Sequence, residues 1–396
     1  MRPLSGSRVV DFGQGVAGPY CSMLLGDFGA DIIKVEPMRG DWSRAMGTLV
    51  SEHESTTYLS VNRNKRSICL DMTKVEAREV AAELVGQSDV VVESFRPGVM
   101  QRMGLDYERL SCSDPRLIYC SITGFGSDGP YAQLPAGDST IQALGGLMSI
   151  VGEPDRGPVR VGNVVSDMLA GMHGFEAVLL AMLERQATGR GRKCEISLLD
   201  TLLAFQAPPL VEYLATEQLP QRSGGSHPLI APSGVLLTTD RPITFTVLAH
   251  QWASFCEFLG EPQLEADPRF VTNETRAANR SALMNLIQAK SSGRSSAELL
   301  HAMREADILC APVNSYQDVA EDMHVQHTGL LRQVQHPTLG VIPFVANPIR
   351  FKGQEAEIAP PPMLGEQTRS ILADVLRKSG DEIEALAAVG AINPPP

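Results

Sequence analysis

The sequence predicts an α/β protein, with a large Rossmann-like domain built on a parallel sheet and a smaller α/β domain. The first two hundred residues alternate short runs of valine and isoleucine with amphipathic segments. Such an alternation is typical of buried parallel strands joined by crossover helices. The length of 396 residues also exceeds what one small hydrophobic core usually organises, which indicates more than one domain.

The N-terminal half supplies the elements of the parallel sheet in order. Strands are expected at residues 8–12, 30–36, 67–72, 89–95, 117–125 and 193–199. Helices are expected at 19–29, 75–86 and 167–186, the last of them long and apolar. We therefore assign residues 1–215 to the N-terminal part of the large domain.

The second half begins with a change of composition. Residues 221–234 are rich in Gly, Pro and Ser, which indicates a loop into a second unit. We expect that small domain at 225–320, with a strand at 242–248 and helices at 249–259, 276–291 and 296–305. Residues 325–396 are expected to return to the large domain, extended at 334–351 and helical at 366–378.

Composition limits the classes of binding partner and the cellular compartment that we expect for this protein. A net charge of -12 argues against a nucleic-acid or anionic-membrane surface. The sequence shows no apolar signal core and no uninterrupted apolar run of ~18 residues, so no membrane partner is expected. Seven cysteines without a CxxC pair and eight histidines without an HExxH motif indicate reduced thiols and no metal site. A cytoplasmic location is the resulting expectation.

A glycine motif follows the first expected strand. Gly13, Gly15 and Gly18 form GxGxxG between a strand and a helix, and Glu36 ends the next strand. This arrangement fits the dinucleotide-binding fingerprint, in which the acid binds a ribose hydroxyl. A glycine-rich turn that merely packs a helix on a sheet gives the same pattern. A nicotinamide-dependent dehydrogenase is therefore one alternative.

The stretch GNVVSDMLAG, residues 162–171, places the acid Asp167 among small and apolar residues. One interpretation is a helix cap, because Ser and Asp satisfy the free N–H groups of a helix start. The other is a nucleophile in a closed pocket. The local residues leave both open.

Longer fragments then point to one family. They include VAGPYCSMLLGDFGADIIKVEP (16–37), VVVESFRPGVMQRMGL (90–105), TGRGRKCEISLLD (188–200) and PPPMLGEQT (360–368). With these fragments the chain resembles the family III coenzyme A transferases nearly end to end. The resemblance implies an interlocked homodimer, no permanently bound cofactor and a coenzyme A (CoA) thioester as substrate.

The resemblance also implies the chemistry of Asp167. Its carboxylate would attack an acyl-CoA donor and pass through aspartyl anhydride and aspartyl-CoA thioester intermediates to a carboxylic acid acceptor. A free Asp with a pKa of ~3.9 would be ionised for this at neutral pH.

Further positions match the CoA-binding residues of the family. The residues expected to line the CoA site are Val16, Ala17, Leu70, Ser94, Phe95 and Leu198. Arg96 and Arg102 are expected to bind CoA phosphates. Asp138 matches an acid beside the nucleophile and is included in the binding set. For Arg63, Lys65 and Arg66, contact with CoA and ordinary loop placement are both open.

Two departures from the family bear on the reaction. Related racemases carry a histidine where this chain has Gly137, and a racemase needs two acid/base groups. Transfer is therefore favoured over racemisation or isomerisation. The glycine loop at 223–226 is only SGGS, and Val16 replaces a polar residue of the oxalate-acting members. The acids exchanged stay open, and so does transfer of CoA within one diacid.

Overall fold

The computed structural model describes residues 2–52, 54–352 and 358–393, and divides the chain into two compact units. Unit 1 comprises Met1–Gly145, Gly162–Ala207 and Gln326–Pro396, and unit 2 comprises Gly146–Val161 and Pro208–Val325. The sequence placed 146–161 in the large domain, but this segment belongs to unit 2. There the N–H of Gly224 donates to the carbonyl of Gly152 at 3.1 Å.

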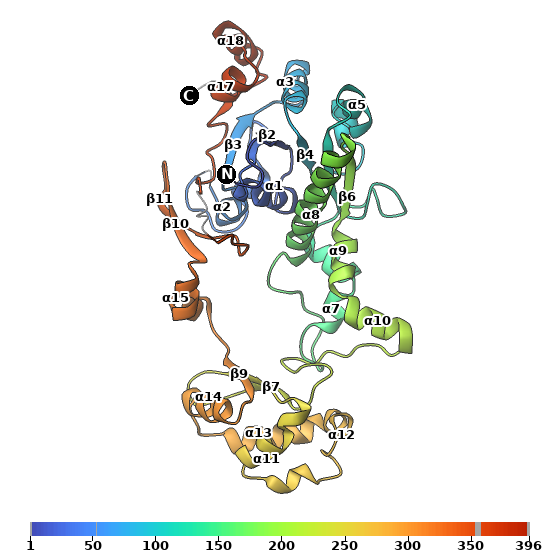
Figure 1. Cartoon of the computed structure of the whole chain (residues 1–396), viewed down its shortest axis with the longest axis vertical. Coiled ribbons are helices and arrows are strands. Elements are labelled where there is room, and N and C mark those ends of the chain that lie inside the picture. The colour runs from blue at the N-terminus through green and yellow to red at the C-terminus, as the bar shows by residue number, and fades with distance from the viewer. Residues whose placement is uncertain (1, 53, 353–357, 394–396) are drawn as a thin grey trace. The chain divides into compact units, whose positions relative to one another are not determined.

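The sheet of unit 1 consists of six parallel strands (Figure 1). They are β1 (Arg8–Asp11), β2 (Asp31–Glu36), β3 (Lys65–Cys69), β4 (Val90–Glu93), β5 (Ile118–Thr123) and β6 (Lys193–Ser197). Their order is β3-β2-β1-β4-β5-β6, so the direction of winding reverses between β1 and β4. This confirms the predicted α/β sheet and gives it the doubly wound order of Rossmann folds, which bind ligands at that reversal.

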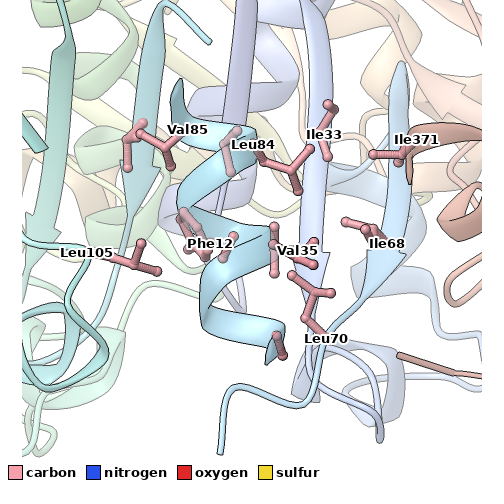
Figure 2. Packing of buried hydrophobic residues seen from close by; sticks show 14 of the residues in the cluster. Phe12, Ile33, Val35, Ile68, Leu70, Leu84, Val85, Leu105 and Ile371 are labelled. Atoms are coloured by element: carbon pink, nitrogen blue, oxygen red, sulfur yellow. The ribbon is translucent and has the colours of Figure 1, made fainter. Parts of the chain in front are cut away.

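One face of the sheet is covered by α3 (Val75–Gly86). Leu84 and Val85 of this helix share a buried core with Ile33 and Val35 of β2, and Figure 2 shows these side chains together. Ile371 from the C-terminal part belongs to the same core, which ties the returning chain to the sheet.

The other face carries α1 (Ala17–Asp27) and α8 (Val165–Thr188), which pack on each other. Gly171 permits the approach, because a Cβ there would lie 2.8 Å from the carbonyl oxygen of Ala17. Gly174 similarly lies against Cys21 and Cys120. The start of α1 and the first turns of α8 are therefore neighbours.

Shorter elements complete unit 1. The helices are α2 (Thr56–Val61), α4 (Val99–Met103), α5 (Tyr107–Ser113), α6 (Asp138–Leu144), α9 (Leu198–Phe205), α17 (Thr368–Ser370) and α18 (Gly380–Ala388). The segment expected to be merely extended at 334–351 is instead an antiparallel hairpin of β10 (Leu331–His336) and β11 (Gly340–Val345). The helix expected at 366–378 is short and continues as a π-helical turn over Ile371–Val375.

Unit 2 has its own core on an antiparallel sheet of β7 (Ser233–Leu236), β8 (Ile243–Thr246) and β9 (Leu309–Pro312). Its main helices are α11 (Trp252–Phe258), α12 (Asn273–Ala278), α13 (Arg280–Ser291) and α14 (Ser296–Glu305). Smaller helices are α7 (Leu147–Ile150) and α15 (Tyr316–Glu321), while α10 (Ala207–Thr216) and α16 (Met323–Thr328) cross the unit boundaries. The rings of Phe245 and Phe255 stack at 5.6 Å in this core.

Within the described residues, α8 is the one helix long and apolar enough to cross a membrane by length and composition. It packs against α1, β5, β6 and α9 in unit 1, as the core helix of an α/β fold does. Length and apolar composition alone are therefore weak evidence for a span. Part of its apolar surface is exposed, including Leu180 and Leu183.

Candidate active site

Most residues expected at the site follow the carboxyl ends of parallel strands. Val16 and Ala17 come after β1, Ser94 to Arg96 after β4, and Leu198 after β6. The carboxyl ends of parallel strands lie at one edge of a sheet. The helix α8 leads into β6, so its N-terminus, with Asp167, also lies at this edge. Topology thus brings the predicted nucleophile and the predicted CoA-binding loops to the same place.

The start of α8 is capped by an acid from another helix. Asp138, the first residue of α6, accepts from the Ser166 N–H at 2.9 Å and from the Ser166 hydroxyl at 2.8 Å. Its second oxygen accepts from the Gln142 amide at 2.7 Å. The capping function considered for Asp167 is therefore supplied by Asp138, and no side chain of the α8 start makes an N-cap hydrogen bond.

Asp167 itself is half-buried in the first turn of α8. Within the described part of the chain, its carboxyl has no hydrogen-bond or ion-pair partner. Burial, and then the neighbouring charge of Asp138, raise the pKa of the Asp167 carboxyl to about 7. This corrects the expectation of an Asp ionised with an ordinary pKa. A carboxyl with a strongly raised pKa at a ligand-binding edge is typical of functional sites.

The N-terminus of α1 faces this region. Ala17 lies against Gly171, which is one turn after Asp167 on the same face of α8. Among the described residues, the N–H groups of Val16, Ala17 and Gly18 have no hydrogen-bond partner. Free N–H groups carry the positive end of the helix dipole, which stabilises negative charge. The site therefore combines a carboxyl with donors suited to an oxyanion.

A buried set of charges holds the glycine turn before α1. Asp11 accepts from the Gly13 N–H at 2.8 Å, and Asp41 accepts from the Gly15 N–H at 2.9 Å. The ammonium of Lys34 donates to the Gly13 carbonyl at 2.8 Å and pairs with Asp41 at 2.8 Å. Although burial opposes it, Asp41 raises the pKa of Lys34, which keeps the ammonium charged. These buried contacts fix the conformation of the glycine turn.

Glu36 does not serve the dinucleotide fingerprint. Its carboxylate is buried and binds both Nε and Nη2 of Arg44 at 2.8 Å, and it accepts from the Ser67 hydroxyl at 2.6 Å. A ribose hydroxyl would have to displace this bidentate pair. The glycine motif instead serves packing, since Gly13 and Gly18 lie in contact. Glu36 is therefore not available to bind a ribose hydroxyl, as the nicotinamide hypothesis requires.

The basic run left open by the sequence is used internally. Its ion pairs are Arg63 with Asp27 at 2.6 Å, Lys65 with Asp11 at 2.9 Å, and Arg66 with Asp31 at 2.7 Å. These three cations therefore hold strand and helix ends together within the fold.

Arg96 and Arg102 differ from those cations. Both side chains are exposed, and neither has an ion-pair partner among the described residues. The loop between them and β4 is fixed by Glu93, which accepts from the Phe95 N–H at 2.8 Å. The Ser94 hydroxyl accepts from the Gln14 N–H at 3.2 Å, so it joins this loop to the glycine turn. The two guanidinium groups stay available to an anion.

Other predicted lining residues are less accessible. Leu70 is fully buried in the core beneath α3, so its side chain has no surface open to a ligand, and its role at the CoA site stays a prediction. The physical reason is the alternation of β3, which points this side chain to the α3 face. Val16, Ala17 and Leu198 are buried as well, and Phe95 packs partly against the core. Their backbone groups remain at the edge of the sheet.

The sequence did not single out Trp42. Its ring lies over Gly15, because a Cβ on that glycine would be 2.1 Å from the indole. One signal was present, a rare aromatic residue in the loop that follows β2. Within the described residues, no group of three or more His, Cys, Asp or Glu could hold a metal ion.

Comparison with known proteins adds independent findings. The family model CoA-transferase family III matches residues 4–368. A mouse protein named succinyl-CoA:glutarate CoA-transferase is 36% identical over 99% of this chain and 91% of its own length. A formyl-CoA:oxalate CoA-transferase of Bradyrhizobium sp. (strain ORS 278) is 32% identical over 100% of this chain and 98% of its own length. A crystal structure of a CAIB/BAIF family protein from Brucella suis superimposes with a TM-score of 0.85 at 35% identity, covering 94% and 99% of the two chains.

The raised pKa of Asp167 predicts a pH dependence. If ionised Asp167 reacts, kcat/KM should rise with pH, inflect near 7 and level off above it. Asp138→Asn removes the neighbouring negative charge, so the inflection should move to lower pH. The measurement is a pH–rate profile of both proteins, with Asp106→Asn, at the cap of α5, as the matched control. An inflection that stays in place in Asp138→Asn would contradict the electrostatic coupling.

Proposed function

Because the chain belongs to CoA-transferase family III, we propose that it transfers CoA from an acyl-CoA thioester to a free carboxylic acid through Asp167. The observation that carries the assignment of Asp167 is that its carboxyl is left unpartnered, among the described residues, while Asp138 caps the same helix. The relatives named for succinyl-CoA, glutarate and oxalate each act on at least one dicarboxylic acid. A short dicarboxylic acid is therefore the first acceptor to test.

In the first half of the reaction, an Asp167 oxygen attacks the thioester carbonyl carbon of the donor. A C–O bond forms, the C–S bond breaks, and the electron pair leaves with the CoA thiolate. The product is a mixed anhydride between Asp167 and the donor acyl group. The thiolate then attacks the Asp167 carbonyl carbon, forming the aspartyl-CoA thioester and releasing the donor acid.

In the second half, the acceptor carboxylate attacks the aspartyl-CoA thioester and displaces the thiolate again. The thiolate attacks the acceptor acyl carbon of the new anhydride, which frees the acceptor acyl-CoA and restores the Asp167 carboxylate. No net proton is transferred. Each addition develops an oxyanion, and the free N–H groups of Ala17 and Gly18 beside α8 are suited to stabilise it.

The structure supports transfer over racemisation. Removal and return of a proton at the α-carbon needs two acid/base groups on opposite sides. Gly137, directly before α6, offers no side chain for the second group. The nearby His173 donates from Nδ1 to the Leu169 carbonyl within α8, at 2.9 Å, so this ring nitrogen is occupied. A single carboxyl suits a nucleophile better than a pair of bases.

Arg96 and Arg102 are proposed to bind the CoA phosphates. They follow β4 at the reversal of the sheet, where doubly wound folds bind nucleotides. Both are exposed and unpaired within the described chain, whereas Arg63 and Arg66 form ion pairs. A guanidinium fork can bind two phosphate oxygens at once.

We also propose that the protein is a homodimer. Leu180 and Leu183 on α8 are 67% and 64% exposed. Large apolar side chains exposed close together on one helix are a feature of surfaces that bind another protein. A second copy of the chain would bury them, which agrees with the interlocked dimer that the family resemblance implies.

Asp167→Ala should abolish transfer while leaving the fold intact. The expected loss is several orders of magnitude in kcat, because the covalent route is removed rather than weakened. The assay follows formation of glutaryl-CoA from succinyl-CoA and glutarate by mass spectrometry. Asp200→Ala, which removes an exposed acid from the first turn of α9, is the matched control and should keep full activity. Substantial transfer by Asp167→Ala would contradict the assignment.

Arg102→Ala should raise the KM for the CoA donor far more than it lowers kcat. Loss of one charge-assisted contact is expected to cost on the order of 1.5–3 kcal/mol of binding. Steady-state kinetics at saturating acceptor measure this split. The control is Arg116→Ala, since Arg116 is exposed at the opposite, amino end of β5. If both variants keep the original KM, Arg102 is ordinary surface charge.

The proposed dimer is tested by sedimentation velocity at micromolar concentration. The unmodified protein should sediment with twice the mass of one chain. The double variant Leu180→Lys and Leu183→Lys should shift toward one chain, because burying two ammonium groups is unfavourable. Val75→Lys, at an exposed helix start, should leave the mass unchanged. A stable, active monomer of the unmodified protein would overturn this proposal.

A further inference from the structure

We propose that unit 1 carries a binding site for a small organic anion at the edge of the sheet opposite to Asp167. The ligand class is a molecule with two or more negative charges and a flat apolar body. The site is a cavity of about 430 Å³ beside the end of α1, and its lining includes Phe28, Phe351 and Arg350. This volume lies within the range of small-molecule sites. The inference does not depend on the proposed function.

The cavity is remote from the candidate active site. The helix α1 starts at Ala17, which contacts Gly171 on α8, and leads to the amino end of β2. Its 11 residues span about 15 Å along the helix axis, and its last residue, Asp27, lines the cavity. The amino ends of parallel strands lie at the edge opposite to their carboxyl ends. A ligand in this cavity is therefore separate from one at Asp167.

The lining carries more positive charge than its own acid can neutralise. The one acid on it is Asp27, which is buried and already paired with Arg63. The Arg63 guanidinium donates to it from Nε at 2.8 Å and from Nη2 at 2.6 Å. The cations on the lining, Arg63 not among them, are Arg2, Arg332, Arg350 and Lys352. In a chain with a net charge of -12, this cluster is a local excess of positive charge.

At least two of these cations are available to a ligand. Arg350 and Lys352 are exposed, and neither forms an ion pair or a side-chain hydrogen bond within the part of the chain that the structure describes. Arg332 donates from Nε to the Gly329 carbonyl at 3.0 Å, which orients its guanidinium group beside the cavity. Guanidinium groups bind carboxylate or phosphate oxygens two at a time. The cavity therefore suits a ligand with more than one negative charge.

The apolar part of the lining indicates that the ligand also has an apolar body. The Phe28 ring stacks on Phe175 of α8 at 5.7 Å between centroids and meets the Phe351 ring edge-on at 5.9 Å. Phe351 is 50% exposed and Ile349 is 53% exposed, and both line the cavity. An inorganic ion would leave these side chains in water. A flat organic anion would cover them while its charged groups reach the cations.

Hydrogen bonds fix the frame of the cavity. Asp27 accepts from the side-chain amides of Asn64 at 2.8 Å and Asn347 at 3.1 Å, and so joins the end of α1 to the returning chain. The Leu4 N–H donates to the Phe28 carbonyl at 3.0 Å, which attaches the N-terminal segment to the same helix end. A cavity whose walls are already ordered loses little conformational entropy when it binds a ligand.

Isothermal titration calorimetry of the full-length protein tests the ligand class. The probes are 1-naphthyl phosphate, inorganic phosphate and 1-naphthol. The first should bind at least about tenfold more tightly than the other two, because phosphate lacks the apolar body and 1-naphthol lacks the charge. Equal binding of either simpler probe, or no binding of 1-naphthyl phosphate, would overturn the proposal.

A double variant tests the cations. Arg350→Ala with Lys352→Ala should raise the Kd for 1-naphthyl phosphate at least about tenfold, because two unpaired cations are removed. The matched control is Arg190→Ala with Arg192→Ala, which removes the same charge at the same spacing from exposed positions before β6. The control should bind the probe like the unmodified protein. Equal affinities of the two double variants would overturn the site.

Two further variants test the apolar wall and the location. Phe351→Ala should reduce the preference for 1-naphthyl phosphate over inorganic phosphate, and an unchanged preference would overturn the assignment of this wall. Arg96→Ala with Arg102→Ala, at the opposite edge of the sheet, should leave the Kd for 1-naphthyl phosphate unchanged. Loss of binding in this variant would place the probe at the carboxyl edge and overturn the proposal.

Discussion

The arrangement of the candidate site depends on how the free N–H groups at the start of α8 are satisfied. Asp138, on α6, accepts from the N–H and the hydroxyl of Ser166, so the helix is capped by an acid outside its own sequence. Asp167 lies in the first turn of α8, where an acid often caps the helix and stabilises its dipole. Because Asp138 supplies the cap, the Asp167 carboxyl makes no capping hydrogen bond. Burial, and then the nearby charge of Asp138, disfavour ionisation of the half-buried Asp167 carboxyl and raise its pKa to about 7.

A second constraint separates structural cations from available ones at the same edge of the sheet. Lys34 and Lys65 are buried and bind Asp41 and Asp11, and this set holds the glycine turn against α1. Removing one partner would leave a buried charge unpaired, which is strongly destabilising. Arg96 and Arg102 are exposed and have no ion-pair partner among the described residues. The buried ion pairs thus fix the edge of the sheet, while the exposed arginines can bind an anionic ligand.

The periodicity of the sequence predicted the parallel sheet and its helices because buried strands and amphipathic helices leave local patterns. Its failures concern contacts between segments distant in the chain. Segment 146–161 carries no local mark of its membership in unit 2. The burial of Leu70 follows from strand alternation against α3. The raised pKa of Asp167 follows from its burial and then from Asp138, twenty-nine residues earlier in the chain. The sequence also does not distinguish arginines that form ion pairs, such as Arg63, from those without an ion pair in the described residues, such as Arg96.

The central claim is that Asp167 forms the covalent intermediates, and trapping them tests it most directly. The protein is incubated with an acyl-CoA and then with hydroxylamine, which cleaves aspartyl anhydrides and thioesters to a hydroxamate. Peptide mass spectrometry then locates the modified residue. We predict a hydroxamate on Asp167, dependent on acyl-CoA. A label on Asp138 or another acid, or none under conditions of active transfer, would contradict the account.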